Sequence, residues 1–344
     1  MTAEIRIQLA DLIAAIRRAL GEAGVPSNVR EIEAEVMAEA DLMGVPSHGV
    51  RWLPGLVKAI LERRVNPDPR LSIIRERAAT CVMEGDNGPG RYVATRGMEN
   101  AIERAARYGA GVCLAARTTH WGRAHSYACR AARAGMIGIC TTNAITNMLA
   151  WGSSRPLLGN NPLAIAVPRG PGLDPIVLDL AMSQAAVGKV GTYMREGRAV
   201  PKGWGLDSEG QPTSDPAAIM ASRKFLPMGE HKGAGLALMM ELLTAALSGG
   251  LFSHEIERVD SSALDPNSSK LFVALDVAAF VDPQRLAARV EEFLSYLREA
   301  QEPGEPILYP GERGWQTRAR NLAEGVPVHH DIVAQLQSAG ISLP

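Results

Sequence analysis

The chain has 344 residues, of which 46% are hydrophobic, 21% are charged and 5% are aromatic. This length suffices for one large domain or two modest ones with a sizeable core. The formal net charge of −1 gives no electrostatic reason to expect nucleic acid or an anionic membrane as a partner, so small molecules and further copies of the chain are the expected partners.

Four scattered cysteines form no CxxC pair: Cys81, Cys113, Cys129 and Cys140. This spacing favours reduced thiols over a disulfide framework or a zinc site. The first twenty residues lack the apolar core of a signal peptide, and no run approaches the roughly 18 apolar residues of a membrane span. We therefore expect a cytoplasmic protein.

Three helices are predicted at the start of the chain. Apolar residues recur at three- and four-residue intervals over 7–24, 28–43 and 50–64. Ser27 and Ser47 stand where they could cap the second and third of these helices.

From about residue 72 the pattern changes to short apolar runs bounded by Gly, Pro or Asn, which predict strands. These runs are ATCVMEG, GAGVCLAAR, GMIGICTTN, PLAIAVP, PIVLDLA and KLFVALDVAAF. Helical stretches lie between some of them and return near the C-terminus. The pattern therefore indicates a mixed α/β core with helical material from both chain ends.

Residues 191–216 are rich in Gly, Pro and polar residues. A loop of this length inside a compact domain is either disordered or shaped for a purpose, such as covering a site.

Several common motifs are absent. No GxGxxG follows a strand, and GxxxxGK[ST], HExxH and GxSxG do not occur. The sequence therefore gives no support for a standard Rossmann site, a P-loop, a zincin or a serine hydrolase.

His48 stands where the third helix is expected to begin. Free N–H groups and the macrodipole at a helix N-terminus disfavour an imidazolium, so the pKa of His48 is expected to be lowered. Such a group could exchange protons near neutral pH, and the alternative is an ordinary polar residue of the first turn.

Residues 120–127 occupy a predicted turn from a strand to a helix, a common place for ligands. His120, Arg123 and His125 lie in this turn. Arg123 could pair with a carboxylate or phosphate. The HxxxxH spacing lacks a nearby carboxylate, so no metal site is expected.

Two further places carry polar groups next to apolar elements. Asp179 ends a predicted strand, where it could be a cap, a ribose ligand or a catalytic partner. His231 and Lys232 precede a glycine-spaced helix start. Because a cation is unfavourable beside the positive end of the helix dipole, this pair suggests a bound anion.

These motifs, taken in order, resemble the type-2 malate/L-lactate dehydrogenases, which are NAD(P)-dependent oxidoreductases unrelated to the Rossmann-fold lactate dehydrogenases. The resemblance runs nearly end to end and rests on SHGV, HWxRxxSY, TNA followed by WG, GNNPLAIAVP, DLAMS followed by GK, GWGLDSEGQPTSDP, HKGAGLALMMELL, PGE and NLAEGVPV. The HWxR form is similar to the 2,3-diketogulonate reductase branch.

The resemblance implies a non-Rossmann α/β fold with a mixed, largely antiparallel sheet flanked by helices, whose helical N- and C-terminal regions pack together. Residues 1–72, with 305–344, would form a helical region for substrate and dimer contacts, and 73–304 a core that binds the nicotinamide cofactor. The family works as a homodimer with its sites near the subunit interface.

The resemblance also implies roles for single residues. His48 would donate and accept the proton, with Asp179 and His120 as further catalytic residues. The substrate would contact Ser47, Arg51, Trp52, Arg123 and Asn143. The cofactor would contact Asn161, Asp179, Leu180, Ser183, Gln184, Lys189, His231, Lys232, Gly311, Glu312 and Arg313.

The chain departs from the family at two positions after the histidine. Family members usually carry Arg four residues after it and often Tyr four further on, where this chain has Trp52 and Leu56. Arg51 sits one residue earlier, about 100° away around an α-helix, so it would not simply take over the same direction. We therefore expect an apolar Trp52 wall, substrates bulkier or less acidic than short 2-oxo acids, and Arg123 as a compensating anchor.

The main hypothesis is an enzyme that transfers a hydride between nicotinamide and C2 of a 2-hydroxy/2-oxo acid, with His48 exchanging the proton. One alternative is reduction of cyclic or N-alkyl imino acids. Another is a cofactor-binding protein without catalysis. NAD is the expected cofactor through the HWxR resemblance, and NADP stays open.

Overall fold

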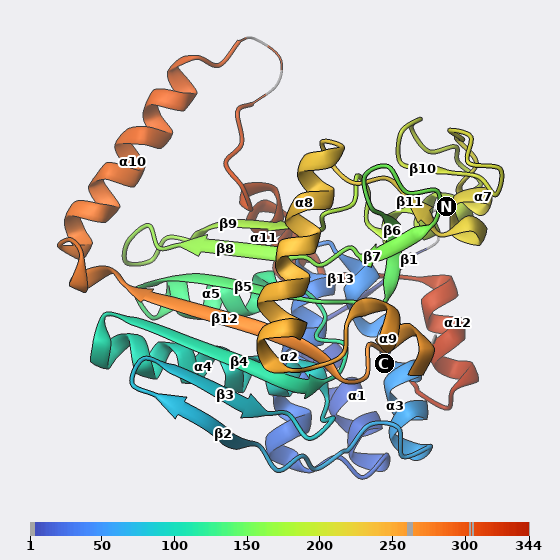
Figure 1. Cartoon of the computed structure of the whole chain (residues 1–344), viewed down its shortest axis with the longest axis horizontal. Helices are drawn as coiled ribbons and strands as arrows, with labels where there is room; N and C mark the ends of the chain where they lie inside the picture. Colours follow the sequence, from blue (N-terminus) through green and yellow to red (C-terminus); the bar gives the residue numbers. More distant parts are fainter. Residues whose placement is uncertain (1–3, 260–263, 303, 305, 344) are drawn as a thin grey trace.

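A seven-stranded sheet forms the centre of the computed structural model, which describes residues 4–259, 264–302, 304 and 306–343 (Figure 1). Its strand order is β2 (Ser72–Arg77), β3 (Thr80–Glu84), β4 (Ala110–Thr118), β12 (Ser268–Asp276), β5 (Met136–Thr142), β8 (Leu163–Val167) and β9 (Ile176–Leu180). Only the β3–β4 pairing is parallel in this sheet, so the expected mixed, largely antiparallel sheet is confirmed.

Two helices cover one face of this sheet, α4 (Gly90–Tyr108) and α5 (His125–Arg133) (Figure 1). Side chains alternate between the faces along a strand. Phe272 and Ala274 of β12 are therefore buried beneath the helices, whereas Leu271 and Val273 point to the opposite face and are half-buried.

The two chain ends pack together, as expected. Strand β1 (Glu4–Ile7) pairs antiparallel with β13 (Val326–His329). Around this pair lie α1 (Leu9–Glu22), α2 (Ser27–Leu42), α3 (Leu53–Leu61), α11 (Glu312–Glu324) and α12 (His330–Ser338). The sequence pattern did not predict β1, because four residues are too few to show a strand period.

Both predicted serine caps are wrong. Ser27 is already helical and Pro26 precedes it as the N-cap of α2, without a side-chain cap bond. Residues after Gly44 form two short 3-10 turns, η1 (Pro46–His48) and η2 (Val50–Trp52), before α3 begins at Leu53. Ser47 thus lies inside a turn and caps no helix.

The stretch expected to be a long loop belongs to a smaller unit. A four-stranded sheet has the order β10 (Gly205–Leu206), β11 (Lys224–Phe225), β6 (Thr146–Leu149) and β7 (Pro156–Gly159). Helices α6 (Val187–Arg195) and α7 (Pro216–Ser222) pack beside it around the buried Val190, Val200 and Ile219. Hydrophobic contacts therefore order residues 191–216.

The remaining helices lie at the open side of the main sheet. Helix α8 (His231–Glu241) continues through a π-helical turn, η3 (Leu242–Ala246), and is followed by α9 (Ser253–Val259). After β12 come the turn η4 (Val277–Ala279) and α10 (Pro283–Glu299), which stands away from the body in Figure 1. No described helix is long and apolar enough to cross a membrane.

Candidate active site

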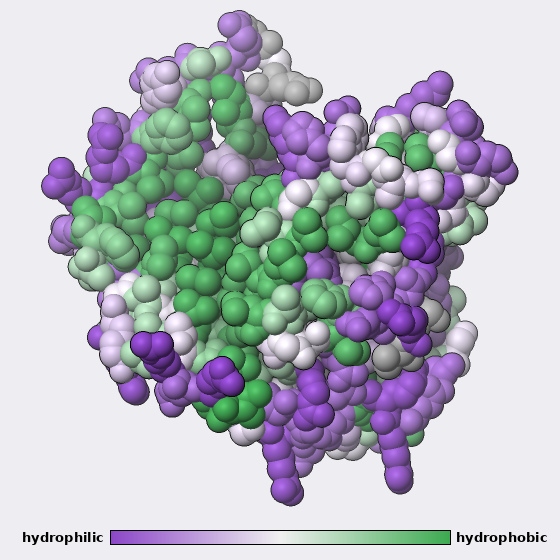
Figure 2. Space-filling view, in the orientation of Figure 1, coloured by the Kyte–Doolittle hydropathy of each residue, from purple (hydrophilic) through white to green (hydrophobic). Residues whose placement is uncertain are grey.

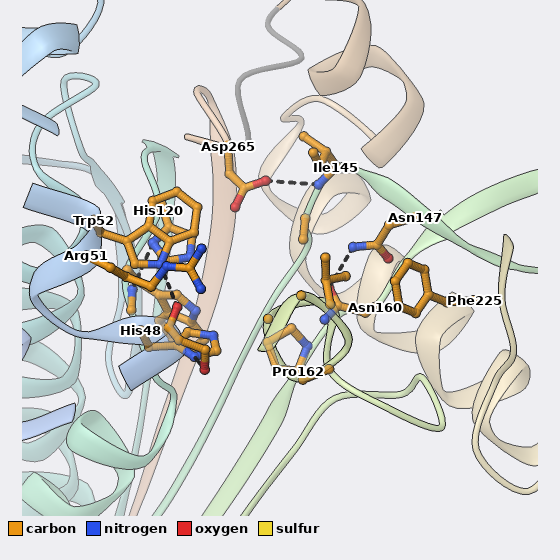
Figure 3. A pocket seen from close by; sticks show the side chains of 18 of the residues that line it. His48, Arg51, Trp52, His120, Ile145, Asn147, Asn160, Pro162, Phe225 and Asp265 are labelled. Atoms are coloured by element: carbon orange, nitrogen blue, oxygen red, sulfur yellow. Dashed lines mark hydrogen bonds between the residues drawn. The ribbon is translucent and has the colours of Figure 1, made fainter. Parts of the chain in front are cut away.

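A cavity of about 550 Å³ lies where η1 and η2 meet the turn after β4, the start of α6 and the first residues of β12 (Figure 3). His48, Arg51, Trp52 and His120 gather on one side of it, and Asn147, Asn160 and Pro162 lie opposite. The structure therefore brings together four of the residues that the sequence singled out, from segments about 70 residues apart.

His48 presents a neutral imidazole to the cavity. Its Nδ1 lies 2.9 Å from Ser47 Oγ, within hydrogen-bond distance. Burial, together with the positive charges of Arg123, Arg91 and Arg51, lowers the pKa of His48 to about 3. The expected direction of the pKa shift is thus found, but its cause is different. His48 ends a 3-10 turn and does not begin an α-helix, so desolvation and guanidinium charges replace the helix dipole.

Buried charges hold the backbone of the His48 turn. Arg91 Nη2 donates to the carbonyl oxygen of His48 at 3.2 Å, and Arg91 Nη1 lies 3.4 Å from Glu33 Oε2. The Asp41 carboxylate accepts the Val50 N–H at 2.7 Å. A Cβ at position 49 would overlap that carboxylate where it stands, and glycine leaves room for it.

Trp52 is fixed as a wall of the cavity. Its ring stacks on His120 with 4.3 Å between ring centroids, and its Nε1 donates to the carbonyl oxygen of Ser47 at 2.7 Å. The His120 ring is in turn 6.0 Å from that of His48. Burial, followed by the charge of Arg91, holds the pKa of His120 well below its usual range. His48 and His120 are therefore both neutral at pH 7.

Arg51 lines the same cavity as Trp52. This stretch is a 3-10 turn, in which adjacent side chains are about 120° apart, so Arg51 and Trp52 reach the cavity in different directions. The cavity therefore has an apolar ring and a guanidinium side by side.

Lys270 is a cavity residue that sequence reasoning missed. It is 1% exposed, its Nζ donates to the hydroxyls of Thr118 and Ser268, and it lies 5.6 Å from the Trp121 ring centroid. Burial lowers its pKa to about 7, and the charge of Asp265 opposes this shift. The signal was present in the strand alternation, which places Lys270 on the same face as the buried Phe272.

Asn143 and Asn161 lie behind the cavity wall. Asn161 Nδ2 donates to Glu241 Oε2 at 2.8 Å, and Asn143 Nδ2 to the carbonyl oxygen of Leu251 at 2.8 Å. Both residues are about 1% exposed. Their neighbours Ala144 and Asn160 line the cavity in their place.

Asp179 and Arg123 form a half-buried ion pair beside the cavity. Arg123 Nε lies 3.3 Å from Asp179 Oδ2 at the end of β9, and Arg123 Nη1 is buried without a partner among the described residues. Neither residue lines the cavity wall. Leu180, next to Asp179, is partly buried near Met148 and Met182.

The segment after β9 connects the cavity with the neighbouring surface. Ser183 is buried and bonds to the carbonyl oxygen of Ala185, while Gln184 is exposed. Gly188 lines the cavity against Ser47, where an added Cβ would be 2.5 Å from the Ser47 Cβ. Lys189 is exposed, with its ammonium 4.9 Å from the Trp204 ring centroid.

His231 and Lys232 lie exposed at the first turn of α8, and the His231 ring is 6.1 Å from that of Trp151. The N–H groups of Lys232 and Gly233 donate to the carbonyl oxygens of Gly229 and Met228. An anion here would therefore meet side-chain cations more than free helix N–H groups.

Gly311, Glu312 and Arg313 begin α11 beside β9. Gly311 has a φ of 93° and packs against the Val177 backbone. Glu312 pairs with Arg298 at 3.1 Å, and Arg313 is exposed. The predicted cofactor residues therefore lie in four places: at Asn161 behind the cavity wall, along 179–189, at the start of α8 and at the start of α11.

These residues fit a nicotinamide cofactor in their chemistry. The cavity offers room beside neutral imidazoles, and Arg123 Nη1 is a buried donor without a partner among the described residues. Lys189 and Lys232 supply exposed cations for phosphate oxygens outside the cavity, and His231 supplies an exposed imidazole beside Lys232.

Known proteins are similar to this chain along almost its whole length. Residues 7–337 match the family described as malate/L-lactate dehydrogenase. The chain belongs to this family. The resemblance seen in the motifs is thereby confirmed, and so is membership of a family of oxidoreductases.

The relatives of this chain are named for different activities. The chain is 32% identical to a malate dehydrogenase of Pyrococcus abyssi, covering 96% of this chain and 93% of the relative. It is 31% identical to a 2,3-diketo-L-gulonate reductase of Shigella boydii, covering 97% and 100%. Its structure is similar to that of a delta1-piperideine-2-carboxylate reductase from Pseudomonas syringae, with a TM-score of 0.87, 30% identity and coverage of 97% and 99%.

Proposed function

We propose that the chain is an NAD(P)-dependent oxidoreductase that interconverts a 2-hydroxy acid and a 2-oxo acid, with His48 exchanging the proton. The observation that carries this proposal is the neutral His48 imidazole, which faces the cavity beside His120 and Lys270. When bound, the nicotinamide cofactor supplies or accepts the hydride. The residues of this chain supply position and proton exchange.

The two ring nitrogens of His48 have different roles in the proposed reaction. Ser47 Oγ engages Nδ1, which leaves Nε2 to exchange a proton with the substrate oxygen. Arg91 and the Asp41–Val50 hydrogen bond keep the turn in place, so they act as positioning groups. Because its pKa is about 3, His48 is in its proton-accepting form at neutral pH.

Replacing His48 tests the proposal. We expect His48→Asn to lower kcat by about a hundredfold or more, because general acid–base catalysis contributes 10²–10⁴-fold. NADH binding, measured by fluorescence titration, should stay within about twofold. His254→Asn, at an exposed histidine, is the matched control and should keep wild-type turnover. Wild-type turnover in His48→Asn would show that His48 does not exchange the proton.

Reduction of a cyclic or N-alkyl imino acid is a second candidate function. The low pKa of His48 makes its protonated form scarce at pH 7, and an iminium needs less help from an acid than a ketone does. The fixed Trp52 ring offers an apolar face to a ring-shaped substrate. The delta1-piperideine-2-carboxylate reductase among the similar structures is named for an activity of this kind.

Steady-state assays separate these possibilities. Pyruvate, oxaloacetate, a diketo-sugar acid and a cyclic imino acid would each be tested with NADH and with NADPH. We expect 2-oxo acid reduction with a preference for NADH. Turnover of the imino acid alone would favour the second candidate, and tight NADH binding without any turnover would indicate a non-catalytic protein.

We also propose that the protein is a cytoplasmic homodimer, with residues 1–72 and 305–344 contributing to substrate and dimer contacts. Exposed apolar side chains support a self-association surface, because monomers rarely expose large contiguous apolar patches. They lie on α8 and its continuation at Leu236, Leu238, Met239, Leu242, Leu243 and Leu247. Figure 2 shows a broad apolar area on this side of the molecule.

A further inference from the structure

Two guanidinium groups line the cavity without a carboxylate partner. Arg51 comes from η2 and Arg195 from the last turn of α6. Neither makes an ion pair with any residue that the structure describes. Asp41 attracts Arg51, but its carboxylate accepts the Val50 N–H instead.

Arg51 and Arg195 lie close enough to repel one another. Partial burial lowers the pKa of Arg51, and the positive charge of Arg195 lowers it as well. Among the described residues, the guanidinium of Arg195 donates a hydrogen bond to Thr192 of its own helix, at 3.0 Å, and to no other side chain. Placing two like charges together costs free energy unless an anion lies between them.

Other cations of the cavity have counter-charges of their own. Arg223 pairs with Glu257, and Lys270 lies under the influence of Asp265. The two histidines are neutral at pH 7. The uncompensated positive charge of the cavity is therefore concentrated at Arg51 and Arg195.

This charge lies at a different depth from Lys270. Lys270 is fully buried, whereas Arg195 is exposed and lies at the mouth. A ligand that spans the cavity can present one anionic group beside His48 and Lys270 and another at the mouth. Trp52, held by its bond to Ser47 and its stack on His120, forms a rigid apolar wall next to Arg51.

We infer that Arg51 and Arg195 bind a second anionic group of the substrate, separate from the carboxylate beside the reacting carbon. The substrate class is then a 2-oxo or 2-hydroxy acid whose far end carries a carboxylate, sulfonate or phosphate. This inference rests on the proposed function for the reaction and assigns the substrate class within it. Guanidinium groups suit such oxyanions because their N–H donors match the oxygens in pairs.

Pairs of substrates with equal carbon number test the inference. The pairs are oxaloacetate with 2-oxobutyrate and 2-oxoglutarate with 2-oxovalerate. We expect the wild type to have a larger kcat/KM for the dianion of each pair, by about tenfold or more. In Arg51→Met and Arg195→Met the ratio of dianion to monoanion kcat/KM should fall by about ten- to a hundredfold, the effect of losing a charge-assisted hydrogen bond. Arg198→Met removes an exposed arginine of the same segment and should keep the wild-type ratio.

Binding of unreactive acids separates failure of this inference from failure of the proposed function. Calorimetric titration of succinate and butyrate in the presence of NADH does not depend on turnover. The wild type should bind succinate more tightly than butyrate, and both single variants should lose this difference. The inference is overturned if the variants weaken both acids equally. It is also overturned if they change only the KM for NADH, which would assign the two arginines to a cofactor phosphate.

Discussion

At the scale of single residues, the site depends on titratable side chains whose pKa values are shifted by burial. Burial lowers the pKa of His48 to about 3 and that of Lys270 to about 7. Both residues therefore bind protons more weakly in the folded chain than in the unfolded chain, where their pKa values are ordinary. Wherever the unfolded chain binds more protons, stability rises with pH.

Lys270 makes this linkage measurable at alkaline pH. Between its folded pKa of about 7 and its ordinary value of 10.5, the unfolded chain carries the extra proton, so wild-type stability gains up to about 1.4 kcal/mol per pH unit from this residue. Lys270→Met should lack this gain. The free energy of unfolding in urea should therefore rise more for the wild type than for the variant between pH 7 and pH 9.5. An unchanged difference between the two proteins would contradict the shifted pKa.

At the scale of elements, the decisive feature is a pair of 3-10 turns where the sequence period predicted the start of an α-helix. The turns place Ser47, His48, Arg51 and Trp52 on one cavity wall. The buried Asp41 stabilises the turns by accepting the Val50 N–H, and glycine at 49 leaves room for its carboxylate.

Two glycines six residues apart test this account of the turns. Gly49→Ala should lower stability by about 1–3 kcal/mol and reduce kcat, because its Cβ overlaps the buried Asp41 carboxylate. Gly55→Ala, in α3 with open space around its Cβ, should stabilise by up to about 1 kcal/mol through helix propensity. Chemical denaturation and steady-state kinetics on both variants measure these effects. Equal stabilities of the two variants would show that Asp41 can move aside.

At the scale of the whole molecule, apolar surface is unevenly distributed. Helices α4 and α5 cover one face of the main sheet, while Leu271, Val273 and Ile165 on the other face are only half-buried. Helix α8 adds exposed leucines and Met239 on that side (Figures 1 and 2). Association with a second copy would remove this surface from water.

Substitution on α8 tests the proposed dimer. We expect the wild type to be a dimer by light scattering after size exclusion, and Met239→Asp with Leu243→Asp to shift it to monomer, because buried unpaired carboxylates disfavour the interface. Tyr108→Asp, at a tyrosine 56% exposed at the end of α4, is the control and should stay dimeric. A wild-type monomer, or a double variant that stays dimeric, would contradict this surface assignment.

The sequence by itself determined the family, the α/β class, most strands and helices, and His48 as the leading candidate for proton exchange. These follow from local periodicity and from motifs whose residues are neighbours in the chain. It also indicated that Trp52 and Arg51 depart from the family pattern.

Only the tertiary structure decided which of these side chains share a cavity. It placed Asn143 and Asn161 behind the wall, paired Arg123 with Asp179, and brought Lys270 and Arg195 to the side of His48. The physical reason is that these placements depend on strand order, on burial between distant segments and on the 3-10 geometry at Val50–Trp52. No local period in the sequence carries that information.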